Sequence, residues 1–147
     1  MKKSLIIALL GISSLGLAAQ DSGTGVGIIV GEPTGISAKS WLSTHDAVDA
    51  GVAWSISNGW LHIHADYLRH FFELIPVEQG KLPFYFGIGA RLGFGNDISI
   101  GARVPVGLAY IFDGTPLDVF IEIVPGFAII PDTKFEMNGG IGVRYWF

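Results

Sequence analysis

The 147-residue sequence contains no cysteine, few charged residues and, beyond its first residues, no run of about 20 apolar residues. Without cysteine the chain forms no disulfide bond and cannot be anchored to a membrane through a lipid-modified thiol. Charged residues make up 15% of the chain, against about 25% in a typical soluble domain. A chain this apolar that lacks a spanning helix has one other way to cross a bilayer, a closed β-barrel whose strands satisfy each other's backbone groups.

The start of the chain has the pattern of an export signal. Lys2 and Lys3 form a basic start, and residues 5–17 are apolar but too short and too interrupted by glycine and serine to span a bilayer. Small residues around position 18 suit a cleavage site. We expect a signal peptide at 1–18 and a single barrel domain at 19–147; an N-terminal membrane anchor is the alternative.

The charge of the chain is negative, with nine basic against thirteen acidic residues. Removal of Lys2 and Lys3 with the signal peptide would change the net charge from −4 to about −6. This sign argues against a nucleic acid as the partner.

Apolar residues alternate with small or polar ones along most of the remaining chain, which is typical of β-strands. In residues 47–56, one face carries Val48, Ala50, Val52, Trp54 and Ile56. The next segment, Ser57-Asn58-Gly59, is a hairpin turn signal, and the alternation resumes after it. We predict eight strands, at 23–31, 35–42, 47–56, 60–71, 82–92, 98–112, 117–129 and 135–147.

The size of the residues on each face predicts which one lies inside the barrel. One face carries bulky aliphatic and aromatic residues on nearly every strand, while the other carries glycines and ionisable groups. The interior of an eight-stranded barrel is just wide enough for side chains, so the glycine-rich face fits inside and the bulky face points into lipid. A soluble barrel of the opposite phase is the alternative.

The chain ends on an apolar strand whose last residue is aromatic. Its outward face carries Ile141, Val143, Tyr145 and Phe147. This segment resembles the closing strand of bacterial outer-membrane barrels, and the whole pattern resembles the small eight-stranded ones, the OmpA membrane domain and OmpX. The resemblance implies an all-β, up-and-down antiparallel transmembrane barrel in the outer membrane. It also implies lipid contact, recognition of the last strand by the barrel-assembly machinery, and a monomer.

The inward face collects both signs of charge, which we interpret as a paired network because buried charges persist when they are paired. Such a network would hold the barrel closed or line a narrow pore. Its predicted members are Lys39, Asp49, His62, His64, Asp66, Arg91, Arg103, Asp118, Glu122, Glu136 and Arg144.

The sharpest local pattern is His62-x-His64-x-Asp66, whose members face the same way at about 6.5–7 Å spacing along a strand. They could ligate a divalent metal if a neighbouring strand closed the site. With Ser55 they could form a hydrolytic set, as in outer-membrane lipid A deacylases and acyltransferases. No motif of those families is present, so we expect no catalysis, cofactor or metal, and predict a structural or narrow-pore protein; a lipid-handling enzyme is the alternative.

Two prolines depart from the strand pattern. Pro105 and Pro125 cannot donate to a ladder, and the expected register places Pro105 beside Val124 and Pro125. Both missing donors would then fall in one seam of the barrel wall. We interpret the prolines as a bulge, with a lateral opening for a lipid tail as the alternative.

Overall fold

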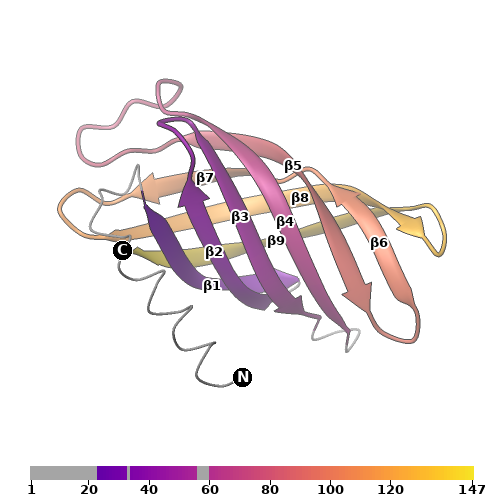
Figure 1. Ribbon diagram of the computed structural model, residues 1–147. Helices are drawn as coiled ribbons and strands as arrows, with labels where there is room; N and C mark the ends of the chain where they lie inside the picture. The colour runs from indigo at the N-terminus through magenta and orange to yellow at the C-terminus, as the bar shows by residue number, and fades with distance from the viewer. Residues whose placement is uncertain (1–22, 33, 56–59) are drawn as a thin grey trace, which may run out of the picture.

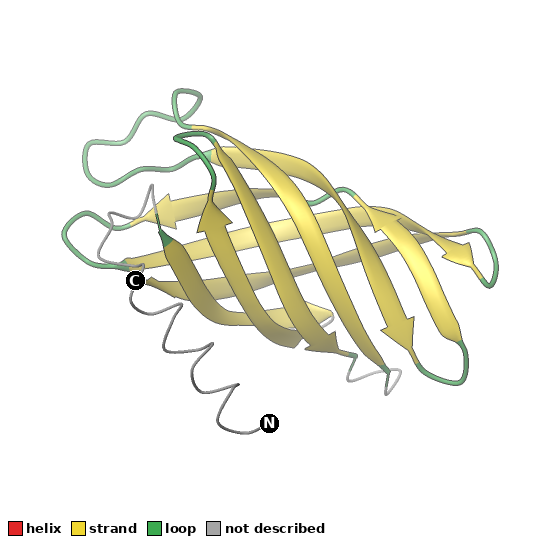
Figure 2. Ribbon diagram, viewed as in Figure 1, coloured by secondary structure: helices red, strands yellow, loops and turns green. Residues whose placement is uncertain are grey.

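The structure, a computed structural model, describes residues 23–32, 34–55 and 60–147. The predicted signal peptide and the whole of the predicted turn at 57–59 lie outside these residues. Figure 2 shows that the described secondary structure consists of strands. They are β1 (Thr24–Glu32), β2 (Thr34–Trp41), β3 (Asp46–Trp54), β4 (Leu61–Phe71), β5 (Phe84–Phe94), β6 (Ile98–Arg103), β7 (Val106–Ile111), β8 (Leu117–Ile130) and β9 (Lys134–Trp146). No helix in the described part of the chain is long and apolar enough to span a membrane.

The strands close into a barrel with antiparallel pairing throughout (Figure 1). The first and last strands pair, with Gly25 opposite Trp146 and Glu32 opposite Gly139. The strands β6 and β7 follow one another between β5 and β8, so together they occupy one position in the wall. The predicted fold class, an eight-stranded antiparallel barrel, is confirmed, and the predicted strand at 98–112 is divided at Val104–Pro105.

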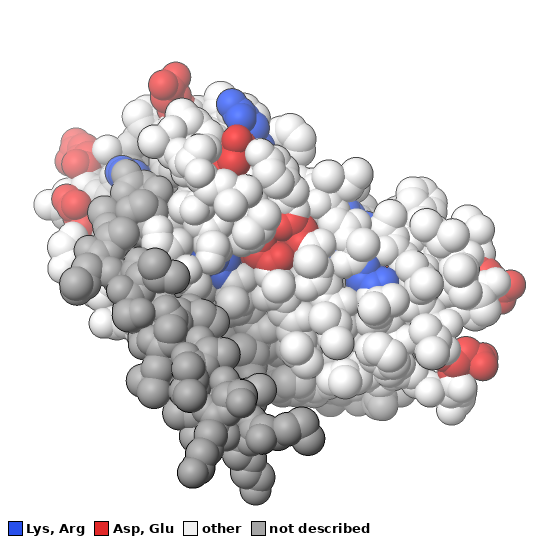
Figure 3. Space-filling model, in the orientation of Figure 1, with Lys and Arg blue, Asp and Glu red and all other residues white. Residues whose placement is uncertain are grey.

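Bulky apolar side chains lie on the outer face of the wall, as the alternation predicts. Figure 3 shows a largely uncharged face, with most of the visible charged groups near the two ends of the barrel. The outward side chains are 38–66% exposed and include Val26, Ile28, Val52, Ile63, Ile88, Ile100, Ile121 and Ile141. Exposed apolar area of this extent and continuity is far greater than a soluble monomer presents to water.

Aromatic side chains lie at both ends of the outer face. At the end where β1 begins and β9 finishes, here called the terminal end, Phe71 stacks on Phe86 with 5.6 Å between ring centroids. At the opposite end, here called the far end, Phe127 and Phe135 meet edge to face at 5.6 Å. Two aromatic rims separated by an aliphatic band are typical of a barrel that spans a bilayer.

The chain keeps its register across the break at Pro105. Arg103 and Val106, on either side of it, pair with β8 in the same frame. The register shift in this part of the wall lies instead between Ile100 and Gly101. The predicted pairing of the two prolines is therefore confirmed, and the predicted bulge at the prolines is wrong.

The expectation that both missing donors lie in one seam is also wrong. Val104 donates its N–H to the Pro125 carbonyl at 2.8 Å, while Gly87 on β5 donates to the Pro105 carbonyl at 3.0 Å. The N–H and C=O of one strand residue point to the same neighbour. The donor that Pro105 lacks would therefore face Gly87, and the donor that Pro125 lacks would face Val104. Each seam lacks one donor, so no patch is doubly weakened for lateral opening.

Inward glycines make room for the large side chains that fill the interior. A Cβ atom added at Gly107 on β7 would lie 2.6 Å from Cζ and the hydroxyl oxygen of Tyr85, which is itself fully buried. The glycine is required here because the ring occupies the space of a side chain. The same contact fixes the position of the Tyr85 hydroxyl, which belongs to the lumen described below.

We predict that Gly107→Ala destabilises the barrel by about 1–3 kcal/mol, the usual cost of overpacking a filled interior. Unfolding by urea in detergent micelles measures the change. The outward Ala90→Val variant on β5 also enlarges a side chain and is expected to change stability by less than about 0.5 kcal/mol. Equal stability of Gly107→Ala and the wild type would show that the ring has room to move.

Candidate functional site

All eleven predicted lumen residues face the interior of the barrel. Nine of them are buried, and His64 and Glu136 are partly buried. Together with four further residues, His70, Trp146, Trp60 and Ser99, they form three groups along the barrel, which we call the terminal, middle and far layers. The terminal layer contains Lys39, His70, Asp118, Arg144 and Trp146; the middle layer contains Asp49, His64, Asp66, Arg103 and Glu122; and the far layer contains Trp60, His62, Arg91, Ser99 and Glu136.

Asp118 organises one half of the terminal layer. It accepts a hydrogen bond from the indole Nε1 of Trp146 at 2.6 Å and pairs with the Arg144 guanidinium at 3.5 Å. The guanidinium also lies over the ring of Phe120, 3.8 Å from its centroid. Asp118 and Arg144 are each at most 2% exposed, so both charges depend on this contact for compensation.

Lys39 forms the other half of the terminal layer with His70. Its Nζ lies 2.6 Å from Nε2 of His70, and the other ring nitrogen, Nδ1, lies 3.1 Å from the carbonyl oxygen of His45. A carbonyl can only accept, so Nδ1 carries the hydrogen and the neutral ring accepts at Nε2 from the ammonium group. We did not predict His70 as a lumen residue, although it continues the period of two through His62, His64 and Asp66.

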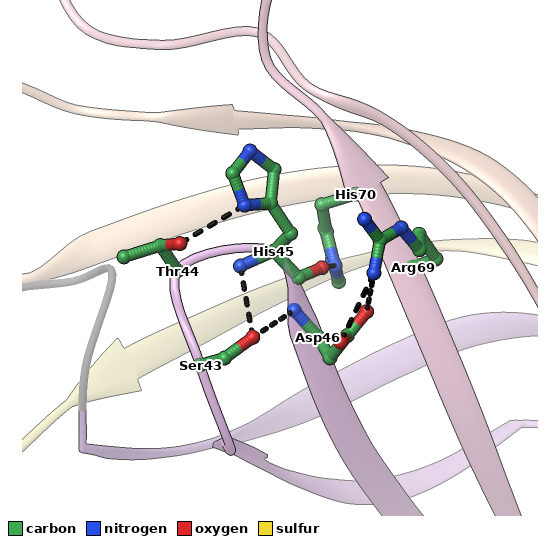
Figure 4. A network of polar contacts seen from close by, with 6 residues as sticks. All are labelled: Ser43, Thr44, His45, Asp46, Arg69 and His70. Atoms are coloured by element: carbon green, nitrogen blue, oxygen red, sulfur yellow. Dashed lines mark hydrogen bonds and ion pairs between the residues drawn. The ribbon is translucent and has the colours of Figure 1, made fainter.

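The loop between β2 and β3 holds His45 in place at the rim of this layer. Figure 4 shows Ser43 accepting hydrogen bonds from the backbone N–H groups of His45 and Asp46, at 3.3 and 3.0 Å. Outside the barrel, Arg69 donates to both carboxylate oxygens of Asp46, at 3.0 and 3.1 Å. This pair lies at the surface, with 53% of the Arg69 side chain and 18% of the Asp46 side chain accessible.

Arg103 is the positively charged residue of the middle layer, and its guanidinium lies near two carboxylates. Its Nε lies 2.9 Å from Asp66, and Nη2 lies 3.8 Å from Glu122. Glu122 also accepts a hydrogen bond from the Tyr85 hydroxyl at 2.9 Å. Asp49 lies directly opposite Asp66 in the pairing of β3 and β4. Asp49 also lies opposite Lys39 in the pairing of β2 and β3, but it takes part in none of the ion pairs described above.

The far layer is centred on Arg91, which binds Glu136 through two nitrogens and donates to Ser99 at 3.0 Å. The guanidinium also lies 5.7 Å from the Trp60 ring. Beyond these residues a cleft of about 570 Å³ opens at the far end, with Lys134 and Asp97 in its lining. The pair thus forms the floor of the cleft and separates it from the middle layer.

The hydrolytic set considered from the sequence is not assembled. Ser55 donates its hydroxyl hydrogen to Glu32 rather than to an imidazole. Neither ring nitrogen of His62 has a hydrogen-bond partner among the described residues. His62 is fully buried and packs edge to face against Trp60, 5.0 Å between centroids. Ser55 and His62 are therefore not placed as a nucleophile and its base.

The lumen also contains an apolar plug that we did not predict. Leu68, Tyr85, Ala109 and Phe120 form one buried cluster, each at most 3% exposed. These residues stand at inward positions of the sequence, where the alternation predicts a polar face. The interior is therefore a packed core with charged layers, as expected for a barrel of this size.

The geometry of the wall can be compared with known proteins. No protein-family model matches the chain, and comparison with curated proteins gives no match. Among solved structures, the N-terminal β-barrel domain of Pseudomonas aeruginosa OprF superposes with a TM-score of 0.66. The superposition covers 84% of this chain and 96% of that domain, at 15% sequence identity. The chain has the fold of that barrel. At this identity the likeness establishes the fold and nothing further.

We predict that Asp118→Ala destabilises the barrel by about 3–5 kcal/mol, because it leaves a buried guanidinium and an indole N–H without their acceptor. Asp46→Ala removes a carboxylate from the exposed pair with Arg69 and is expected to cost at most about 1 kcal/mol. Urea unfolding of both variants in the same micelles provides the comparison. Similar losses of stability for the two variants would contradict the view that the buried Asp118 contacts stabilise the barrel more than the surface pair of Asp46 and Arg69.

Proposed function

We propose that this protein is a small outer-membrane barrel with a structural role, whose lumen is sealed by side chains. The main observation behind this proposal is that the barrel has an apolar outer face and an interior of paired charges. A lipid environment favours this division and water opposes it, because water would face the aliphatic band. The OprF-like fold supports the same assignment.

The seal consists of the three layers and the apolar plug. At the far end the Arg91–Glu136 pair lies across the path, and at the terminal end Trp146 stacks on Trp41 with 6.1 Å between ring centroids. One cavity between them, lined by residues of the described chain, measures about 30 Å³, which is space for only a few water molecules. A narrow pore would require the ion pairs and the aromatic rings to move aside, so the closed lumen favours the structural role over conduction.

The last strand supports the proposed route of assembly. Ile141, Val143, Tyr145 and Phe147 lie on the outer face and are 37–62% exposed. They form one apolar stripe on the outer face of β9, which is the strand that closes the barrel against β1. We propose that the barrel-assembly machinery recognises this apolar stripe and that the mature barrel is a monomer surrounded by lipid.

The lipid-handling alternative receives no support from the arrangement of its residues. The candidate nucleophile is bonded to a carboxylate, and the imidazole expected to activate it is packed against an indole. The seam between β6–β7 and β8, proposed for lipid entry, is missing only one backbone hydrogen bond, the one that Pro125 cannot donate. We therefore propose a non-enzymatic role.

Planar-bilayer recording tests the sealed lumen. We expect the wild type to give no discrete conductance steps, because three layers block the path. Arg91→Ser combined with Glu136→Ser removes only the ion pair of the far layer and is expected to remain closed, since the middle layer, the apolar plug and the terminal layer are untouched. Adding Trp41→Ala and Trp146→Ala at the terminal end, Arg103→Ser in the middle layer and Phe120→Ala in the plug reduces every part of the seal and is expected to produce conductance. Discrete openings of the wild type at moderate voltage would contradict the structural role and favour the narrow pore.

A further inference from the structure

Three side chains of the middle layer converge on one point of the lumen. Asp49 projects from β3, and His64 and Asp66 project from β4. One ligand atom of each lies within 4.8 Å of the other two. The approach is possible because Gly51, opposite His64 in the strand pairing, has no side chain. A Cβ atom there would lie 2.6 Å from Cε1 of the His64 ring.

The polar atoms at this point are buried without hydrogen-bond partners among the described residues. They include Oδ1 of Asp49, both carboxylate oxygens of Asp66 and Nδ1 of His64. Asp49 and Asp66 are 6% and 4% exposed, so solvent does not satisfy them. Asp66 lies 2.9 Å from Nε of Arg103, but the pair is not aligned as a hydrogen bond. Buried acceptors left in this condition are rare and favour a bound cation.

The charge of the middle layer points the same way. Three carboxylates, from Asp49, Asp66 and Glu122, face one guanidinium, from Arg103. Of the other lumen bases, Arg91 pairs with Glu136 and Arg144 pairs with Asp118. Lys39 lies opposite Asp49 in the pairing of β2 and β3, but its Nζ contacts Nε2 of His70 at 2.6 Å. A divalent cation would balance the layer, and uncompensated buried carboxylates would be costly.

We propose that Asp49, His64 and Asp66 bind a divalent transition-metal ion, with Zn²⁺ as the best match. One imidazole nitrogen and two carboxylate oxygens are ligands that Zn²⁺ accepts, at about 2.0–2.2 Å. Calcium and magnesium prefer oxygen ligands alone. The adjoining cavity of about 30 Å³ leaves space for a water ligand. In this position the ion would join β3 to β4, and Arg103 would retain Glu122 as its partner.

The site differs from the pattern considered in the sequence. That pattern used both histidines of β4, whereas Asp49 from the neighbouring strand takes the place of His62. The proposal does not depend on the membrane location or on the state of the pore, since it concerns the interior of the folded barrel alone. Failure of the metal test would leave the sealed-lumen proposal intact.

Titration of the full-length chain, folded in detergent micelles and stripped with a chelator, tests the site with Co²⁺ as the probe. We expect one Co²⁺ per chain, a visible absorption band of four- or five-coordinate cobalt, and displacement of that band by Zn²⁺. The near-isosteric variants Asp49→Asn and His64→Gln are expected to weaken binding at least tenfold. Gly51→Ala keeps all three ligands but displaces the His64 ring, so it is expected to weaken binding as well.

The matched control is His62→Gln, a buried histidine on the same strand and face. Its ring packs edge to face against His64, 6.0 Å between centroids, but it gives no ligand atom to the cluster. It is expected to bind Co²⁺ within about threefold of the wild type. Circular dichroism shows which variants fold. If Asp49→Asn does not fold, Gly51→Ala and His64→Gln still test the site. Absence of stoichiometric binding by the folded wild type would overturn the proposal. Undiminished binding by the folded cluster variants, or equal weakening by His62→Gln, would overturn it too.

Discussion

Closure of the wall is the constraint on which the rest of this structure depends. Pairing of β1 with β9 leaves no free strand edge, but it also limits the interior to a narrow space that side chains must fill. Inward positions are therefore either glycine or part of a packed contact, as with Gly107 against Tyr85 and Gly25 against Trp146. The outer face has no such limit, and bulky aliphatic residues occupy it.

Charges in so narrow an interior must find partners within the barrel, which explains why the lumen is organised in layers. Each guanidinium lies beside at least one carboxylate, and the lysine uses a neutral histidine fixed by the rim loop. The middle layer is the exception, with an excess of carboxylates. The proposed sealed lumen and the proposed cation site both rest on this requirement for charge compensation.

The period of two was enough to predict the strands and which face of the wall points outward, because alternation is local. What the sequence could not show depends on contacts across strands. To predict that Asp49 lies opposite Asp66, one must know the register of β3 and β4. To predict that the N–H groups missing at Pro105 and Pro125 face different strands, one must know the hydrogen bonds on both sides of each strand. The plug around Phe120 was missed because inward apolar residues resemble interruptions of a polar face.

Site-directed spin labelling of β8 in lipid bilayers tests the central claim, an apolar wall facing lipid around a filled interior. The chain has no cysteine, so a single introduced thiol is labelled uniquely. Nitroxides at the outward positions Val119, Ile121 and Ile123 should be accessible to oxygen and shielded from a water-soluble nickel chelate, whereas one at the exposed turn residue Thr115 should meet the chelate. Free access of the nickel chelate to Ile121 would contradict the account.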